Sequence, residues 1–153
     1  MTGSSSILEW IVAIATVVAL LIAAWELRAN AKISGQAHAR EAWMRYLELG
    51  LQYPEYSSTE VTLKILKVPN VIRLWEKESR ETLKYWWFFD CMMEACESLV
   101  NYFPEREWRN TIRYNLLLHE KALRFTWDNE KSYYSDKLNA IVTEVLGSDE
   151  TPL

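Results

Sequence analysis

The sequence has little glycine, proline, cysteine and histidine: four Gly, four Pro, two Cys and two His in 153 residues. Few residues favour turns, and no alternating apolar pattern lies between them, so we predict a nearly all-helical, all-α chain. Cys91 and Cys96 are too few for the disulfide framework of a secreted domain. They are more typical of core thiols than of metal ligands, and they agree with a reducing compartment.

Patterns that indicate catalysis or metal binding are also missing. His119-Glu120 begins like a zinc-protease motif, but Leu123 stands where the second histidine would be. The chain has no histidine pair at i, i+4, no Glu-x-x-His pair for a di-iron bundle, and no Gly-rich phosphate loop. Three acidic residues share one helical face, which is more typical of a solvated surface than of an acid–base site; they are Asp90, Glu94 and Glu97. We therefore expect no enzyme, no metal site and no cofactor.

One long apolar run, ILEWIVAIATVVALLIAAW over residues 7–25, has Glu9 as its only charge. As a helix these residues extend close to 30 Å, about the thickness of the hydrocarbon layer of a bilayer. Trp10 and Trp25 stand near its ends, where interfacial aromatic residues are enriched. The run predicts a transmembrane helix over residues 7–27.

A cleaved signal peptide is the main alternative, because residues 29–31 (Ala-Asn-Ala) resemble a cleavage site. Three features oppose it: residues 1–6 contain no Lys or Arg, the apolar run is long, and Glu26 and Arg28 lie before the site. A buried helix of a soluble core is a second alternative, but the run has no polar stripe. We therefore predict an uncleaved anchor whose partner is the lipid bilayer.

Charges beside the run predict its orientation. No Lys or Arg precedes it, whereas Arg28, Lys32 and Arg40 follow it. By the positive-inside rule the N-terminus lies outside and the rest in the cytoplasm, which in a bacterium means a single-pass inner-membrane protein. The predicted parts are an extracytoplasmic tail (1–6), the span (7–27), a connector (28–36), a cytosolic domain (37–147) and a flexible tail (148–153).

The predicted cytosolic domain has enough residues and aromatic side chains for one core. Beyond residue 25 the chain has 20 acidic and 17 basic residues and six of its eight tryptophans. We predict a compact bundle of about five or six helices. The first helix is expected over 36–52, after a break at Gly35. A short helix follows, opened by a capping box of Ser57 and Glu60, and further helices are expected at 71–75, 81–103, 104–127 and 132–146. Their inner faces include Trp43, Tyr46, Leu47 and Leu51 in the first and Leu138, Ile141, Val142 and Val145 in the last.

Four consecutive aromatic residues, Trp86, Trp87, Phe88 and Phe89, lie in the expected helix 81–103. They spread over roughly 300° of a helix surface, so they cannot all face one core. Either this helix is central and surrounded, or part of the run is an exposed docking surface for a partner or a second copy.

Five basic residues form a stripe along the expected helix 104–127; they are Arg106, Arg109, Arg113, Lys121 and Arg124. On one continuous helix they fall within about 60° of a line and extend about 27 Å. Arginines so placed can bind the phosphate of a nucleotide or an anionic lipid head group. The alternative is a solvated face neutralised by nearby acids. The net negative charge argues against general nucleic-acid binding.

Within the apolar run, Ala15, Ala19 and Ala23 recur at every fourth residue. Such a ridge of small side chains lets two membrane helices approach closely, so it favours a homo-oligomer.

The layout resembles that of small bacterial single-span proteins of unknown function. The resemblance lies in AxxRxAWMRYLELGLQYPEY (37–56), PEREWRNTIRYNLLL (104–118) and FTWDNEKSYYSDKLNAIV (125–142). Some proteins of similar layout are membrane effectors of antiphage defence systems, including systems gated by cyclic nucleotides. Two functions are thus expected: a non-catalytic membrane-anchored interaction or scaffold module, or a ligand-gated effector that binds a nucleotide messenger at the basic stripe and perturbs the membrane.

Overall fold

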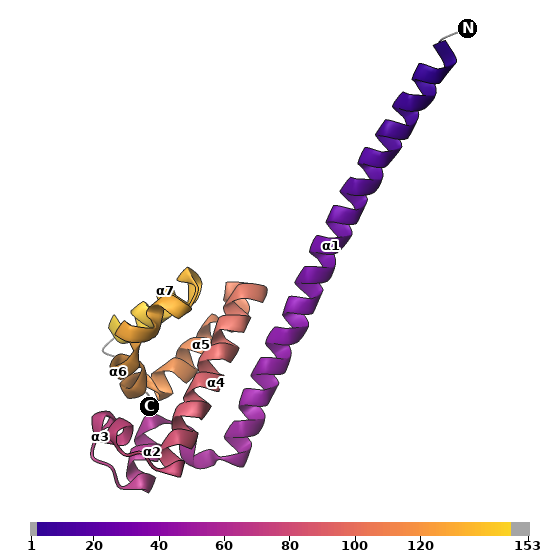
Figure 1. The fold of residues 1–153 in the computed structure, drawn as a ribbon. Helices are drawn as coiled ribbons and strands as arrows, with labels where there is room; N and C mark the ends of the chain where they lie inside the picture. Colours follow the sequence, from indigo (N-terminus) through magenta and orange to yellow (C-terminus); the bar gives the residue numbers. More distant parts are fainter. Residues whose placement is uncertain (1–2, 148–153) are drawn as a thin grey trace. The chain divides into compact units, whose positions relative to one another are not determined.

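The computed structural model describes residues 3–147, and it describes side chains for residues 9–104 and 106–147. All regular elements in this part of the chain are helical, which confirms the predicted all-α class (Figure 1). The α-helices are α1 (Gly3–Gln52), α2 (Thr59–Leu66), α3 (Val71–Glu76), α4 (Arg80–Tyr102), α5 (Glu105–Leu118), α6 (Glu120–Glu130) and α7 (Asp136–Gly147). Two 3-10 turns, Pro54–Tyr56 and Lys131–Tyr133, lie between them.

The chain forms two units, one that ends at Gly35 and one that begins at Gln36. Helix α1 contributes to both, since it continues through Gly35 without interruption. The predicted helix break at Gly35 is therefore wrong. A glycine inside a helix costs only about 1 kcal/mol relative to alanine, and the good helix formers around it offset that cost.

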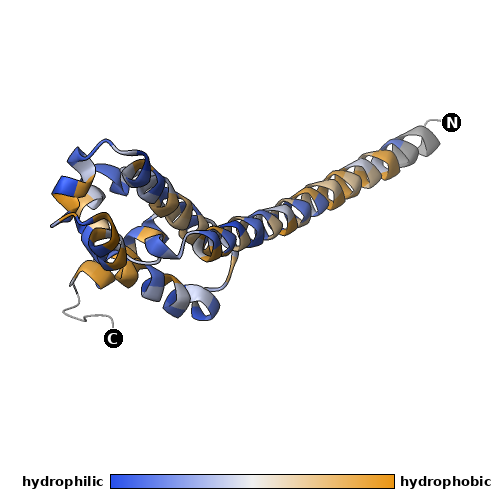
Figure 2. Cartoon of the chain, turned by 90° about the horizontal axis from the view of Figure 1, so that it is seen from below, coloured by the Kyte–Doolittle hydropathy of each residue, from blue (hydrophilic) through white to orange (hydrophobic). Residues whose placement is uncertain are grey.

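In the first unit, one stretch of α1 is mainly apolar, and its apolar residues are orange in Figure 2. Its most apolar 18-residue window has a mean hydropathy of 2.2, and none of that window is buried. Of the helices in the described residues, this one is long and apolar enough to cross a membrane by length and composition, properties that a signal sequence also has.

Helix α4 is the centre of the second unit. Its buried side chains contact residues of α1, α5, α6 and α7 in one apolar core. The largest fully buried side chains of this core are Leu74, Tyr85, Phe89, Met92, Met93, Leu99, Ile112, Leu116, Leu123, Leu138 and Val142. Burying each such apolar side chain contributes about 1.5–3 kcal/mol, so this core is the main source of stability.

Hydrogen-bonding side chains define the starts of the middle helices. Ser58 caps α2 by accepting a hydrogen bond from Val61 N at 3.2 Å, so the predicted cap at Ser57 is wrong by one residue. Ser79 and Thr82 form a reciprocal capping box at the start of α4. This capping box begins α4 as a helix separate from α3.

The predicted single helix over 104–127 is also wrong, because the chain leaves helical geometry at His119 (φ −112°, ψ 18°), between α5 and α6. No glycine or proline marks this position. The His119 ring is fully buried, and its centroid lies 5.9–6.0 Å from those of Tyr85, Phe88 and Phe89. The break coincides with this buried ring, and no local sequence signal predicts it.

Candidate functional site

The helix break divides the basic stripe into two groups. Arg106, Arg109 and Arg113 lie on α5, and Lys121 and Arg124 lie on α6. The five residues therefore do not form the single straight line on one helix that the sequence predicts.

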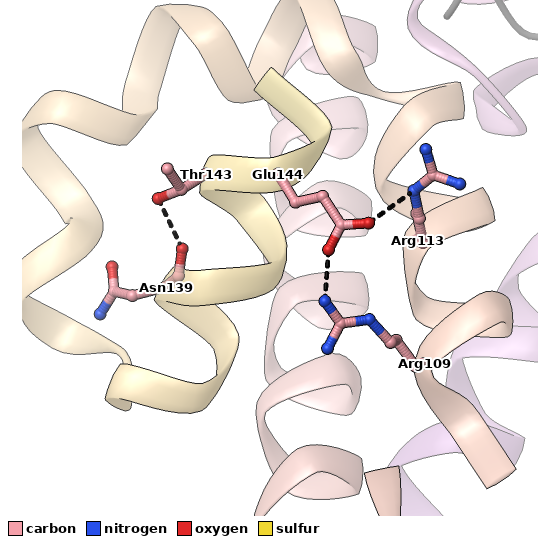
Figure 3. A network of polar contacts seen from close by, with 5 residues as sticks. All are labelled: Arg109, Arg113, Asn139, Thr143 and Glu144. Carbon is pink, nitrogen blue, oxygen red and sulfur yellow. Dashed lines mark hydrogen bonds and ion pairs between the residues drawn. The ribbon is translucent and has the colours of Figure 1, made fainter. Parts of the chain in front are cut away.

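In the first group, α5 is tied to α7 through Glu144. One carboxylate oxygen of Glu144 accepts a hydrogen bond from Arg109, and the other lies 3.4 Å from Arg113 Nε (Figure 3). Arg106, one turn away, is exposed. The two inner arginines thus join neighbouring helices.

In the second group, each cation pairs with an acidic side chain, which lies on another helix for Lys121 and on the same helix for Arg124. Lys121 Nζ lies 2.6 Å from Glu60 on α2, and this hydrogen bond and the lysine charge lower the pKa of the Glu60 carboxylate. Arg124 pairs with Glu120 at 2.7 Å and donates to Leu146 O on α7. These contacts agree with the alternative of a neutralised face, and nucleotide binding at the stripe stays a prediction.

The aromatic run is divided between core and surface. Phe88 and Phe89 are 3% and 0% exposed, so their predicted role in a docking surface is wrong: they face the core between α4, α1 and His119. Trp87 is 56% exposed, and Trp86 is half-buried. Helix α4 is therefore central, with part of the aromatic run on the surface.

Four neighbouring apolar residues of α3 and α4 are exposed or half-buried, and we call them the aromatic surface: Trp75, Leu83, Trp86 and Trp87. The rings of Trp75 and Trp86 meet edge to face with centroids 5.1 Å apart. Leu83, Trp86 and Trp87 line an open depression of about 500 Å³, with Arg80, Lys84 and Asp90 at its edges. An apolar surface rimmed by charges is typical of a site that contacts another molecule.

A buried chain of polar groups connects α2, α4 and the α5–α6 junction. The hydroxyl groups of Thr59 and Tyr85 lie 2.8 Å apart, and Tyr85 Oη lies 3.2 Å from His119 Nδ1. His119 Nε2 has no hydrogen-bond partner among the described residues. Burial lowers the pKa of His119 to about 3, so the ring is neutral at physiological pH. No local sequence pattern predicts these hydrogen bonds, because Thr59, Tyr85 and His119 are far apart in the sequence.

The cysteines are buried or half-buried thiols. Cys96 is fully buried, and burial raises its pKa to about 12, so it is an unreactive thiol at neutral pH. Cys91 is partly exposed, and burial is the main cause of its raised pKa. Within residues 9–104 and 106–147, no group of three or more His, Cys, Asp or Glu side chains is placed to hold a metal ion.

The alanine ridge lies on the exposed part of α1, where Ala15, Ala19 and Ala23 all face outward. Its role in self-association stays a prediction.

Comparison of the chain with protein-family models, with curated proteins and with solved structures gives no match. The arguments about function therefore rest on the residues and their geometry.

Proposed function

We propose that the chain is a membrane-anchored helical interaction module that works by binding a partner protein and not by catalysis. The apolar, unburied first part of α1 carries this proposal, because an exposed 18-residue stretch with a mean hydropathy of 2.2 requires lipid or another cover. The basic residues that follow, Arg28, Lys32 and Arg40, favour a cytoplasmic location for the second unit.

The aromatic surface is the proposed docking site of this module. Trp75 and Trp87 are each 56% exposed although tryptophan carries a large apolar area. Tryptophan and arginine are enriched at the centres of protein interfaces, and the Arg45 guanidinium lies 5.9 Å from the centroid of the Trp87 ring.

Membrane extraction tests the anchor. After expression in a bacterium, the full chain should stay with the membranes in alkaline carbonate, and mass spectrometry should find an uncleaved N-terminus. Replacing Val17 and Leu20 with Arg should release it, because each Arg at the centre of a span costs about 2.5–3.5 kcal/mol. Leu51→Arg, at an exposed apolar position near the end of α1, is the matched control and should change nothing. Release of the unmodified chain by carbonate would contradict the anchor.

Photocrosslinking in cells tests the docking site. A photoreactive amino acid at position 87 should give a discrete protein adduct, whereas the same group at Tyr133, another exposed aromatic residue, should not. Leu83→Glu should abolish the adduct at position 87, because it places a charge on the aromatic surface. Equal adducts at positions 87 and 133 would show that the aromatic surface has no specific role.

A further inference from the structure

A second hollow lies between the C-terminal end of α4, α5 and α7. Its volume is about 450 Å³, within the range of pockets that hold small molecules. Buried Leu99, Ile112 and Ile141 form its floor, and exposed Lys137 and Ala140 stand at its rim. It is thus an apolar cavity with a polar opening.

One wall of this cavity is aromatic. Phe103 and Trp108 line it, and their ring centroids lie 5.8 Å apart. The guanidinium of Arg40 lies 5.4 Å from the centroid of the Phe103 ring. The apolar wall therefore ends beside a positive charge.

Lys137 places a cation at the rim of the cavity. Lys137 Nζ donates to Val100 O at 3.3 Å and forms no ion pair within the described residues. Arg109 also lines the cavity, and its guanidinium binds Glu144. An ammonium bonded only to a backbone carbonyl can exchange that bond for a stronger one to a carboxylate.

We propose that this cavity binds a single long-chain fatty acid, with its alkyl chain against the apolar floor and its carboxylate at Lys137. A nucleotide fits less well, because the cavity is lined mainly by apolar and aromatic side chains and its rim charge suits one anionic group. This proposal is independent of the membrane anchor and of the aromatic surface.

Photolabelling of the full chain tests the proposal. The chain is kept in solution by an amphipathic polymer, which covers the apolar part of α1 whether or not that helix crosses a bilayer. The probe is palmitic acid with a diazirine near its methyl end. Irradiation should label peptides from α4, α5 and α7, and unlabelled palmitate should compete.

Two variants separate this site from general apolar binding. Ala140→Trp fills the cavity from an exposed rim position, and Lys137→Glu reverses the charge; each should reduce labelling of these helices about tenfold, whereas Lys137→Arg should keep it. Lys77→Glu, at an exposed lysine outside the cavity, is the control and should label normally. Circular dichroism should show unchanged helix content in all variants. Labelling confined to residues 9–35, or undiminished in both Ala140→Trp and Lys137→Glu, would overturn the proposal.

Discussion

At the scale of single residues, the buried His119 predicts a loss of stability in acid. Its pKa is lowered from 6.5 to about 3 by burial, so below pH 6.5 the unfolded chain binds a proton that the folded chain does not. The free energy of unfolding should therefore fall as the pH drops from about 6.5 toward 3, by up to about 1.4 kcal/mol per pH unit. His119→Phe should remove this component of the slope, as measured by urea unfolding with tryptophan fluorescence between pH 7 and pH 4.

The titration of Asp90 changes the stability with pH in the opposite direction, so its effect has to be removed from the measurement. Burial, and then the charge of Glu130, raise its pKa to about 6, so the folded chain holds this proton more tightly than the unfolded chain. Its contribution to stability is present at low pH and is lost as the pH rises from about 4 through 6. The comparison is therefore made in an Asp90→Asn background. Equal pH slopes with histidine and with phenylalanine at position 119 would contradict a neutral buried His119.

At the scale of helices, a substitution at Gly50 tests whether the last turns of α1 are helical in the second unit. It lies inside α1, near its C-terminal end, and a Cβ added there meets no atom within 4 Å. Gly50→Ala should raise the free energy of unfolding by about 0.5–1 kcal/mol, because alanine loses less backbone entropy in a helix. Gly147→Ala, in the last position of α7, is the control and should have a smaller effect, since helix ends fray. A decrease with Gly50→Ala in thermal unfolding would mean that this turn is not helical in solution.

The helical class and much of the core could be predicted, because apolar periodicity records which face of a helix is buried. The predicted inner face of the last helix is buried in full, whereas in the helix before Tyr53 only Trp43 and Tyr46 are buried and Leu47 and Leu51 are exposed. Periodicity identifies the apolar stripe of a helix. How many residues of that stripe are buried depends on which other helices pack against it.

The ends of the helices and the arrangement of the proposed sites could not be predicted in the same way, because they depend on contacts between residues that are distant in the sequence. Gly35 does not end a helix, whereas His119 ends one without any local signal. The same break divides the basic stripe, in which Lys121 pairs with Glu60 and Arg109 and Arg113 lie beside Glu144, acids that lie on other helices. Local propensity could not predict these pairs, because they exist only after the helices have packed.

At the scale of the whole molecule, the two units present different apolar surfaces. The first unit exposes an apolar stretch of helix on every side, whereas the second buries most of its large apolar side chains in one core and exposes Trp75 and Trp87 at the aromatic surface. The second unit has a core of its own, so its fold needs no cover from the first. Self-association can therefore be changed in the first unit without unfolding the second.

The alanine ridge allows that separation to be tested. In lipid vesicles, replacing Ala15, Ala19 and Ala23 with Leu should leave membrane insertion intact, because leucine is at least as apolar as alanine. It should weaken self-association about tenfold, or ~1.4 kcal/mol, because larger side chains keep two helices apart. The control places Leu at Ala13, Val17 and Ala24, which lie about 120–160° around α1 from the centre of the ridge, and should not change the fraction of crosslinked dimer. If both sets of substitutions leave that fraction unchanged, the helix acts only as a tether, and any dimer forms through the second unit.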